Sequence, residues 1–72
     1  MSDLTTYAAI AEALDRLPDD LRALRRSRGA SLRDVEAATG VSNATVSQVE
    51  NRNHVPRIDT ATALLRWMDG SR

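Results

Sequence analysis

The chain has 72 residues, a length that predicts a single small domain of marginal stability. It has no cysteine, which excludes disulfide frameworks, thiolate zinc sites and cysteine nucleophiles, and no segment approaches the roughly 20 apolar residues that span a membrane. The net charge is zero but segregated, because residues 1–20 hold five acids and one arginine whereas residues 21–72 hold nine arginines and five acids.

The first predicted helix spans about Leu4–Leu17 and has one apolar stripe. The stripe residues lie three, four and three positions apart, which places them on one helix face; they are Tyr7, Ile10, Leu14 and Leu17. Alanines between them favour the helix. We expect the stripe to pack in the core, and a dimer interface is the alternative interpretation.

A second helix is predicted from Pro18 to about Arg28. Proline disrupts a helix interior but suits the first helical position. Asp19 and Asp20 then lie at the positive end of the helix dipole. Gly29 follows the last turn and can adopt the left-handed conformation that ends many helices.

Three further helices are predicted in the rest of the chain. Ser31 is a suitable N-cap for a helix over about Leu32–Thr39, and Ser42 is one for a helix from Asn43 to about Asn51. A loop then leads to a helix over about Ile58–Met68. Since no segment alternates as a strand does, the predicted fold class is all-α, a compact bundle of about five short helices.

The stretch from Ser31 to Asn51 has the plan of a helix-turn-helix unit. Two capped helices are joined by a turn at Gly40 and Val41, and Gly40 permits the positive φ that a tight turn needs. The second helix leaves short amides, hydroxyls and a methyl group exposed, on Asn43, Ala44, Thr45, Ser47 and Gln48. Asn and Gln can pair with adenine and Ala can contact the thymine methyl, so this helix is the predicted reader of DNA bases.

Three segments carry a resemblance to a known family: LRALRRSRGAS, DVEAATGVSNATVSQVEN and VPRIDTATALL, which together cover about Leu21–Met68. They resemble the phage-repressor and Cro-type helix-turn-helix proteins, the XRE family. The resemblance implies a lambda-repressor-like fold whose second motif helix lies in the major groove. It implies base contacts from Asn43, Ala44, Thr45 and Gln48. It implies contacts to the DNA backbone from Ser42, from Ser47, which can face bases instead, and from Arg57, which can also reach the minor groove. Arg52 and Asn53 lie in the same loop as Arg57 and are expected to add phosphate contacts.

Other positions complete the comparison with that family. The resemblance implies that Arg25 and Glu50 form a charged pair with a structural role. Among the other arginines, Arg33 is the best candidate for a phosphate contact. Glu36 departs from the family because a small residue is usual there, so its carboxylate must reach solvent or find a partner. The other departures are Leu32, where a phosphate-contacting Gln is often found, and Thr39, where Leu is commoner.

These observations predict a sequence-specific DNA-binding transcriptional regulator, expected to be a repressor. The predicted domain organisation is an accessory helix over residues 1–17 and a DNA-binding domain over residues 18–69, which together form one compact unit. We expect a homodimer on double-stranded DNA with an inverted repeat, its half-sites about one helical turn apart. The alternative is a protein-interaction module on the same fold, antitoxin-like or a phage accessory protein, with weak or no DNA binding.

Enzymatic activity is not expected, because no catalytic motif is visible. We also expect no cofactor, no metal, no small-molecule ligand and no membrane partner. His54 is the only histidine and is expected in a solvent-exposed loop. The expected location is the cytoplasm of a bacterial cell or a phage-infected host.

Overall fold

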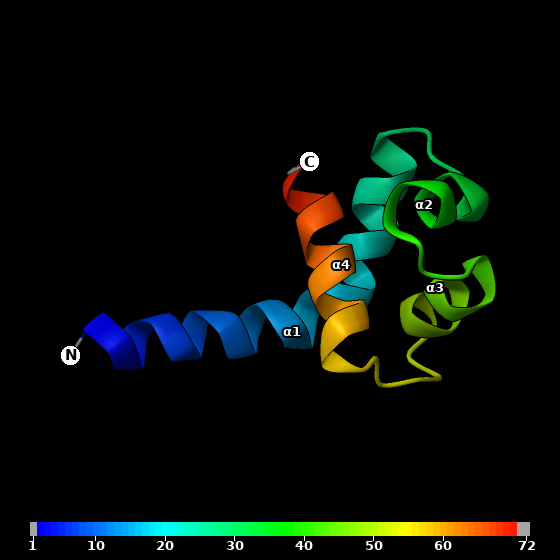
Figure 1. Ribbon diagram of the computed structural model, residues 1–72. Coiled ribbons are helices and arrows are strands. Elements are labelled where there is room, and N and C mark those ends of the chain that lie inside the picture. Colours follow the sequence, from blue (N-terminus) through cyan, green and yellow to red (C-terminus); the bar gives the residue numbers. More distant parts are fainter. Residues whose placement is uncertain (1, 71–72) are drawn as a thin grey trace.

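The computed structural model describes residues 2–70, with side chains from residue 6 onward, and in that range it has four helices and no strand. The helices are α1 (Ser2–Ser27), α2 (Leu32–Thr39), α3 (Asn43–Glu50) and α4 (Ile58–Asp69). Both α1 and α2 pack against α3 and α4. Figure 1 shows α2 and α3 together at one end of the molecule and the N-terminal part of α1 at the other. The predicted all-α fold class is confirmed.

Instead of the two helices predicted over residues 4–28, the structure has one, because α1 continues through Pro18. Pro18 has no N–H, so the carbonyl of Leu14 loses its helical partner, and Figure 1 shows α1 changing direction between its blue and cyan parts. Two features keep the chain helical. The apolar stripe continues in phase from Leu17 to Leu21 and Leu24, and Leu17 is not a residue that caps a new helix.

The core lies where all four helices meet. α1 contributes Leu17 and Leu21 to it, and both are fully buried. The other buried apolar residues are Val35, Val46, Val49, Ala61 and Leu64. Burying a side chain of the size of Leu or Val stabilises the fold by about 1.5–3 kcal/mol. This small aliphatic core therefore fixes α3 against α1, which sets the direction in which the outer face of α3 points.

The expectation that the whole N-terminal stripe packs in the core is wrong for its first two members. Tyr7 is 67% exposed and Ile10 is 50% exposed, whereas Leu14 is half-buried. We call residues 6–13 of α1 the arm, because Figure 1 shows this part of the helix extending away from the other helices. The arm contributes to the longest dimension of the molecule, which measures 40 × 25 × 20 Å.

Arg28 fixes the end of α4 against α1. Its Nη1 and Nη2 donate to the carbonyl oxygens of Trp67 and Met68 at 2.8 and 2.7 Å, and the guanidinium lies 4.7 Å from the centre of the Trp67 ring. The last carbonyls of a helix lack helical donors and carry partial negative charge, so a cation stabilises them.

Within residues 2–70, no helix is both long and apolar enough to cross a membrane.

Candidate nucleic-acid interface

The turn between α2 and α3 is held by short polar contacts. Ser31 and Asp34 form a reciprocal capping box at the start of α2, with hydrogen bonds of 3.0 and 2.8 Å. Gly40 ends α2 with φ +80°, and its N–H donates to the carbonyl of Glu36 at 2.8 Å. Thr39 Oγ1 accepts from the N–H of Val41 at 3.1 Å, so the threonine that departs from the family pattern stabilises the turn.

The start of α3 is capped by Ser42. Its Oγ accepts from the N–H of Thr45 at 3.2 Å and donates to Thr45 Oγ1 at 2.8 Å. A serine cap leaves the remaining N-terminal amides of α3 pointing outward, where they can meet an anion such as phosphate. Ser42 itself is exposed and Thr45 is half-buried.

The opposite faces of α3 differ sharply in burial. Val46, Val49 and Glu50 face the core and are buried. Ala44 and Gln48 are exposed, and the Gln48 side chain makes no hydrogen bond within the described part of the chain. The structure therefore leaves an amide that can donate and accept, and a methyl group one turn before it, on the outer surface of α3.

Asn43 is engaged inside the motif. Its Nδ2 donates to Glu36 Oε1 at 2.8 Å across the turn, and both residues are half-buried. The Glu36 carboxylate is thus paired with an amide donor, as its half-buried position requires. The amide oxygen of Asn43 and its second N–H are left for other contacts. No local pattern in the sequence predicts that the Glu36 carboxylate lies beside the first residue of α3, because the two residues are brought together by the turn.

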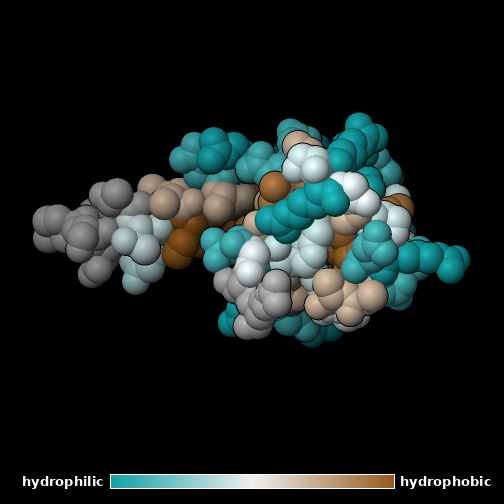
Figure 2. Space-filling view, turned by 90° about the horizontal axis from the view of Figure 1, so that it is seen from above, coloured by the Kyte–Doolittle hydropathy of each residue, from teal (hydrophilic) through white to brown (hydrophobic). Residues whose placement is uncertain are grey.

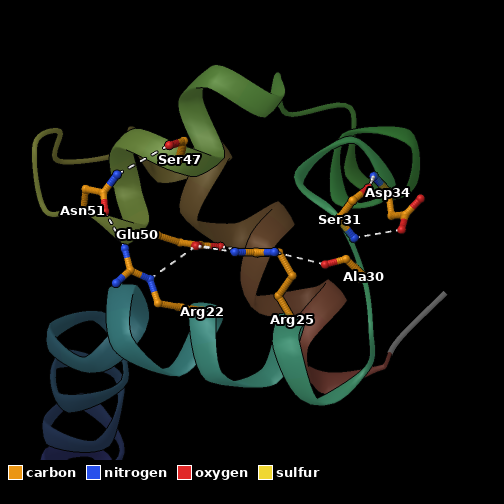
Figure 3. A network of polar contacts seen from close by, with 8 residues as sticks. All are labelled: Arg22, Arg25, Ala30, Ser31, Asp34, Ser47, Glu50 and Asn51. Carbon is orange, nitrogen blue, oxygen red and sulfur yellow. Dashed lines mark hydrogen bonds and ion pairs between the residues drawn. The ribbon is translucent and has the colours of Figure 1, made fainter.

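The Arg25–Glu50 contact joins α1 to α3 from the inside. Arg25 Nε and Nη2 donate to the two carboxylate oxygens of Glu50 at 2.7 and 2.9 Å, and Arg25 Nη1 donates to the carbonyl of Ala30 at 3.1 Å (Figure 3). The Glu50 side chain is only 3% exposed and that of Arg25 is 15% exposed. The hydrogen bond to Glu50 raises the pKa of Arg25 above its already high ordinary value, so the guanidinium stays charged.

A second arginine joins the same network. Arg22 Nε lies 3.6 Å from Glu50, and the Arg22 guanidinium also donates to Asn51 at the end of α3. Asn51 Nδ2 in turn donates to Ser47 Oγ at 3.4 Å, as Figure 3 shows. Sequence reasoning missed Arg22, although it lies three residues before Arg25 on the same face of α1.

The candidate backbone-contacting residues fall into two groups. Arg33 on α2 and Asn53 in the loop are exposed, and neither side chain has a hydrogen bond or an ion pair within residues 6–70. Arg57 is exposed and has one long ion pair, 3.7 Å to Asp59. Arg52 differs, because its guanidinium donates to Asp19 at 3.0 Å and to the carbonyl of Asp15 at 3.4 Å. It is held against α1 rather than beside α3.

The chemistry of this surface suits recognition by hydrogen bonding. The exposed and half-buried polar side chains of α3 are amides and hydroxyls, which keep one charge state across the physiological pH range. Among the described residues no group of His, Cys, Asp and Glu is arranged to hold a metal ion. His54 is exposed in the loop after α3.

Comparison with known protein families identifies the family to which the chain belongs. A helix-turn-helix domain family matches residues 16–70, a range that contains α2, the turn, α3 and α4 and leaves out the arm. No significant match is found among curated proteins or among solved structures.

Proposed function

Because the chain belongs to the helix-turn-helix domain family, we propose that it is a sequence-specific DNA-binding transcriptional regulator that reads the major groove with α3. The observation that carries this proposal is the outer surface of α3, where Ala44 and Gln48 stand exposed beside a capped helix N-terminus. Gln pairs bidentately with adenine N6 and N7, and an Ala methyl packs against the thymine methyl.

Asn43 and Thr45 complete the proposed base-reading set. Glu36 already accepts from one of the two amide N–H groups of Asn43. Asn43 can therefore contact a base only through its amide oxygen and its second N–H. Thr45 adds a hydroxyl whose hydrogen bond to Ser42 fixes its position. A side chain held in one rotamer loses less freedom on binding, which favours specificity.

Backbone contacts are proposed for residues that border α3. They are Arg33, Ser42, Ser47, Arg52, Asn53 and Arg57. Arg33 and Arg57 have the greatest freedom to reach phosphate, since one has no internal partner and the other only a long, solvent-screened one. Arg52 must first leave Asp19, so we rank it last.

We propose further that the protein is a repressor that binds as a homodimer to an inverted repeat. A two-fold dimer presents two copies of α3 to one face of the duplex, so half-sites separated by one helical turn or a multiple of it are required. Occupation of such a site at a promoter blocks polymerase.

A second candidate is a protein-interaction module on the same fold. It is favoured by the zero net charge and by the carboxylate of Glu36 beside the first residue of α3, since both oppose attraction to phosphate. On this alternative the outer face of α3 contacts a protein instead of base edges.

Selection from a randomised duplex library with the purified chain at moderate salt tests the first proposal. Enrichment of an inverted repeat is the expected result and gives the half-site spacing directly. Enrichment of a single half-site would keep the proposed base reading but remove the homodimer. No enrichment, with folding checked by circular dichroism, would overturn DNA reading and favour the protein-interaction module.

A further inference from the structure

Large apolar side chains outside the core are concentrated in two places. Among the described residues four are exposed: Tyr7 and Ile10 on the arm, and Val55 and Ile58 at 89% and 77% exposure around the start of α4. Figure 2 shows tan and brown surface along the arm, between the grey N-terminal residues and the rest of the molecule. Concentrated apolar surface on a small protein marks an interaction site.

The arm continues the core stripe beyond the core. Tyr7, Ile10, Leu14, Leu17 and Leu21 follow one another at spacings of three and four residues, and burial rises along them from 67% exposed to fully buried. Such spacing is typical of a helix that packs along another apolar surface. A short helical segment with no packing is marginal in water, so the exposed half of the stripe calls for a partner surface.

A groove that opens at the base of the arm supplies a second apolar surface. It has a volume of about 570 Å³ and is lined by Leu14, Pro18, Val55, Pro56 and Ile58, among others. Leu14 belongs both to the arm's stripe and to this groove, so the two surfaces are continuous. The arm cannot fill its own groove, because α1 is one helix that carries the arm away from it (Figures 1 and 2).

We propose that these surfaces form a homodimer interface in which the arm of each protomer packs in the groove of a second copy. This inference deepens the homodimer of the proposed function and rests on it. A convex apolar helix and a concave apolar groove on one chain are self-complementary, and a two-fold axis makes each contact twice. Specific interfaces bury at least about 1,000 Å² in total. The four exposed apolar side chains of each protomer, eight in the dimer, can supply this area together with their surroundings.

Apolar contact rather than charge carries this interface. The arm has one charged residue, Glu12, whereas the groove is lined by Asp15, Arg52 and His54, and Arg52 is already paired with Asp19. The charges at the groove therefore largely offset one another, and burial of the apolar side chains supplies the attraction. In Figure 1 the arm and α3 lie at opposite ends of the molecule, so the arm of each protomer does not cover its own α3. Of the residues proposed to contact DNA, the groove includes Arg52 alone, the one ranked last.

Sedimentation equilibrium of the full chain tests the interface. We expect a dimer for the natural sequence, and for Ile10→Glu and Ile58→Glu a dimer dissociation constant raised roughly thirty-fold or more, as for central interface residues. Both positions are exposed, so the variants keep their helical circular dichroism. Ala9→Glu, on another face of the arm, is the matched control and should remain dimeric.

Cysteine pairing locates the contact, since the chain has no cysteine of its own. We expect an Ile10→Cys chain mixed with an Ile58→Cys chain to form the mixed disulfide on oxidation, faster than either chain links to itself. If Ile10→Cys chains link only to one another, the proposed packing of the arm in the groove is overturned, and the arms of the two protomers pair with each other instead.

The remaining outcomes separate this inference from DNA reading. A natural chain that is monomeric at all concentrations would overturn the interface and the homodimer, while library selection still reports on base reading. A dimer that survives both glutamate substitutions would overturn the interface alone. If both proposals hold, Ile10→Glu binds the same half-site sequence more weakly, and Gln48→Ala stays dimeric but prefers different bases.

Discussion

Glu50 is the one buried polar residue among the described side chains, and its position shows why α3 needs α1. A carboxylate removed from water is costly unless it is paired and hydrogen-bonded. Arg25 meets this need with two hydrogen bonds, and Arg22 adds a more distant charge. The pair therefore sets the register of α3 on α1, and with it the direction of Gln48 on the opposite face.

Replacement of Arg25 by Ala should destabilise the fold by about 3 kcal/mol. Removal of one partner from a buried pair costs about 3–5 kcal/mol, and we expect the lower end because Arg22 remains 3.6 Å from Glu50. A domain of this length has roughly 4–11 kcal/mol of stability in all, so the loss is large. Urea unfolding measures it.

Two variants control this experiment. Arg26→Ala removes an exposed arginine at the next position of α1 and should change stability by less than about 0.5 kcal/mol. Arg25→Met combined with Glu50→Leu removes both charges and should recover most of the loss. If Arg25→Ala is as stable as Arg26→Ala, the pair does not hold α3.

Gln48 allows the register of α3 to be tested at one base pair. Its amide is exposed and unpartnered within the described residues, so Gln48→Ala should cost about 1–3 kcal/mol of discrimination at one position of the site. Competition binding with duplexes that vary at each position measures this. Arg57→Ala, which removes a proposed phosphate contact, should weaken all duplexes alike. Equal weakening by Gln48→Ala would mean that α3 enters the groove in another register.

At the scale of elements, the turn between α2 and α3 requires glycine at position 40 because of the backbone conformation there and not because of crowding. A Cβ atom added there would meet no atom within 4 Å, but φ is +80°. Gly40→Ala should therefore cost about 1–2 kcal/mol, the penalty of the left-handed conformation. The midpoint of chemical unfolding measures the change.

Gly40→Asn separates conformational strain from crowding. Asn tolerates the left-handed region better than Ala and is the larger residue, so it should cost less than Ala if strain is the cause. A greater loss for Asn than for Ala would show that the space around the turn, not φ, is limiting.

The helices that could be predicted closely are those whose limits depend on neighbouring residues. Ser31, Gly40 and Ser42 set the limits of α2 and the start of α3 through contacts within a few positions, so sequence alone was sufficient. Pro18 was misread because its local preference is overridden by Leu17 and Leu21, which pack in the core. One lost hydrogen bond is less costly than exposing this stripe.

At the scale of the whole molecule, the residues that the arginines contact could not be predicted from the sequence. Arg28 contacts residues 39 and 40 positions away, and Arg52 contacts Asp19 across 33 positions. Such pairs depend on tertiary packing and leave no local pattern. Of the nine arginines in the described range, six have partners inside the chain: Arg16, Arg22, Arg25, Arg28, Arg52 and Arg57. Less positive charge is therefore available to DNA than the composition of residues 21–72 indicates.

This distribution of charge predicts a shallow salt dependence of DNA binding. Arg33 has no hydrogen-bond or ion-pair partner among the described residues, and the one ion pair of Arg57 is long and exposed, so these two arginines are the most available to phosphate. If each neutralises one phosphate, a dimer makes four such contacts, and the logarithm of the affinity should fall against the logarithm of salt concentration with a slope of about −3.6. Arg33→Ala should reduce the slope to about −1.8, whereas Arg26→Ala should leave it unchanged. Fluorescence anisotropy with the selected duplex between about 50 and 200 mM salt measures it. A slope near zero would favour the protein-interaction module. A slope of about −7 would mean that internally paired arginines such as Arg52 exchange their carboxylates for phosphate when the protein binds.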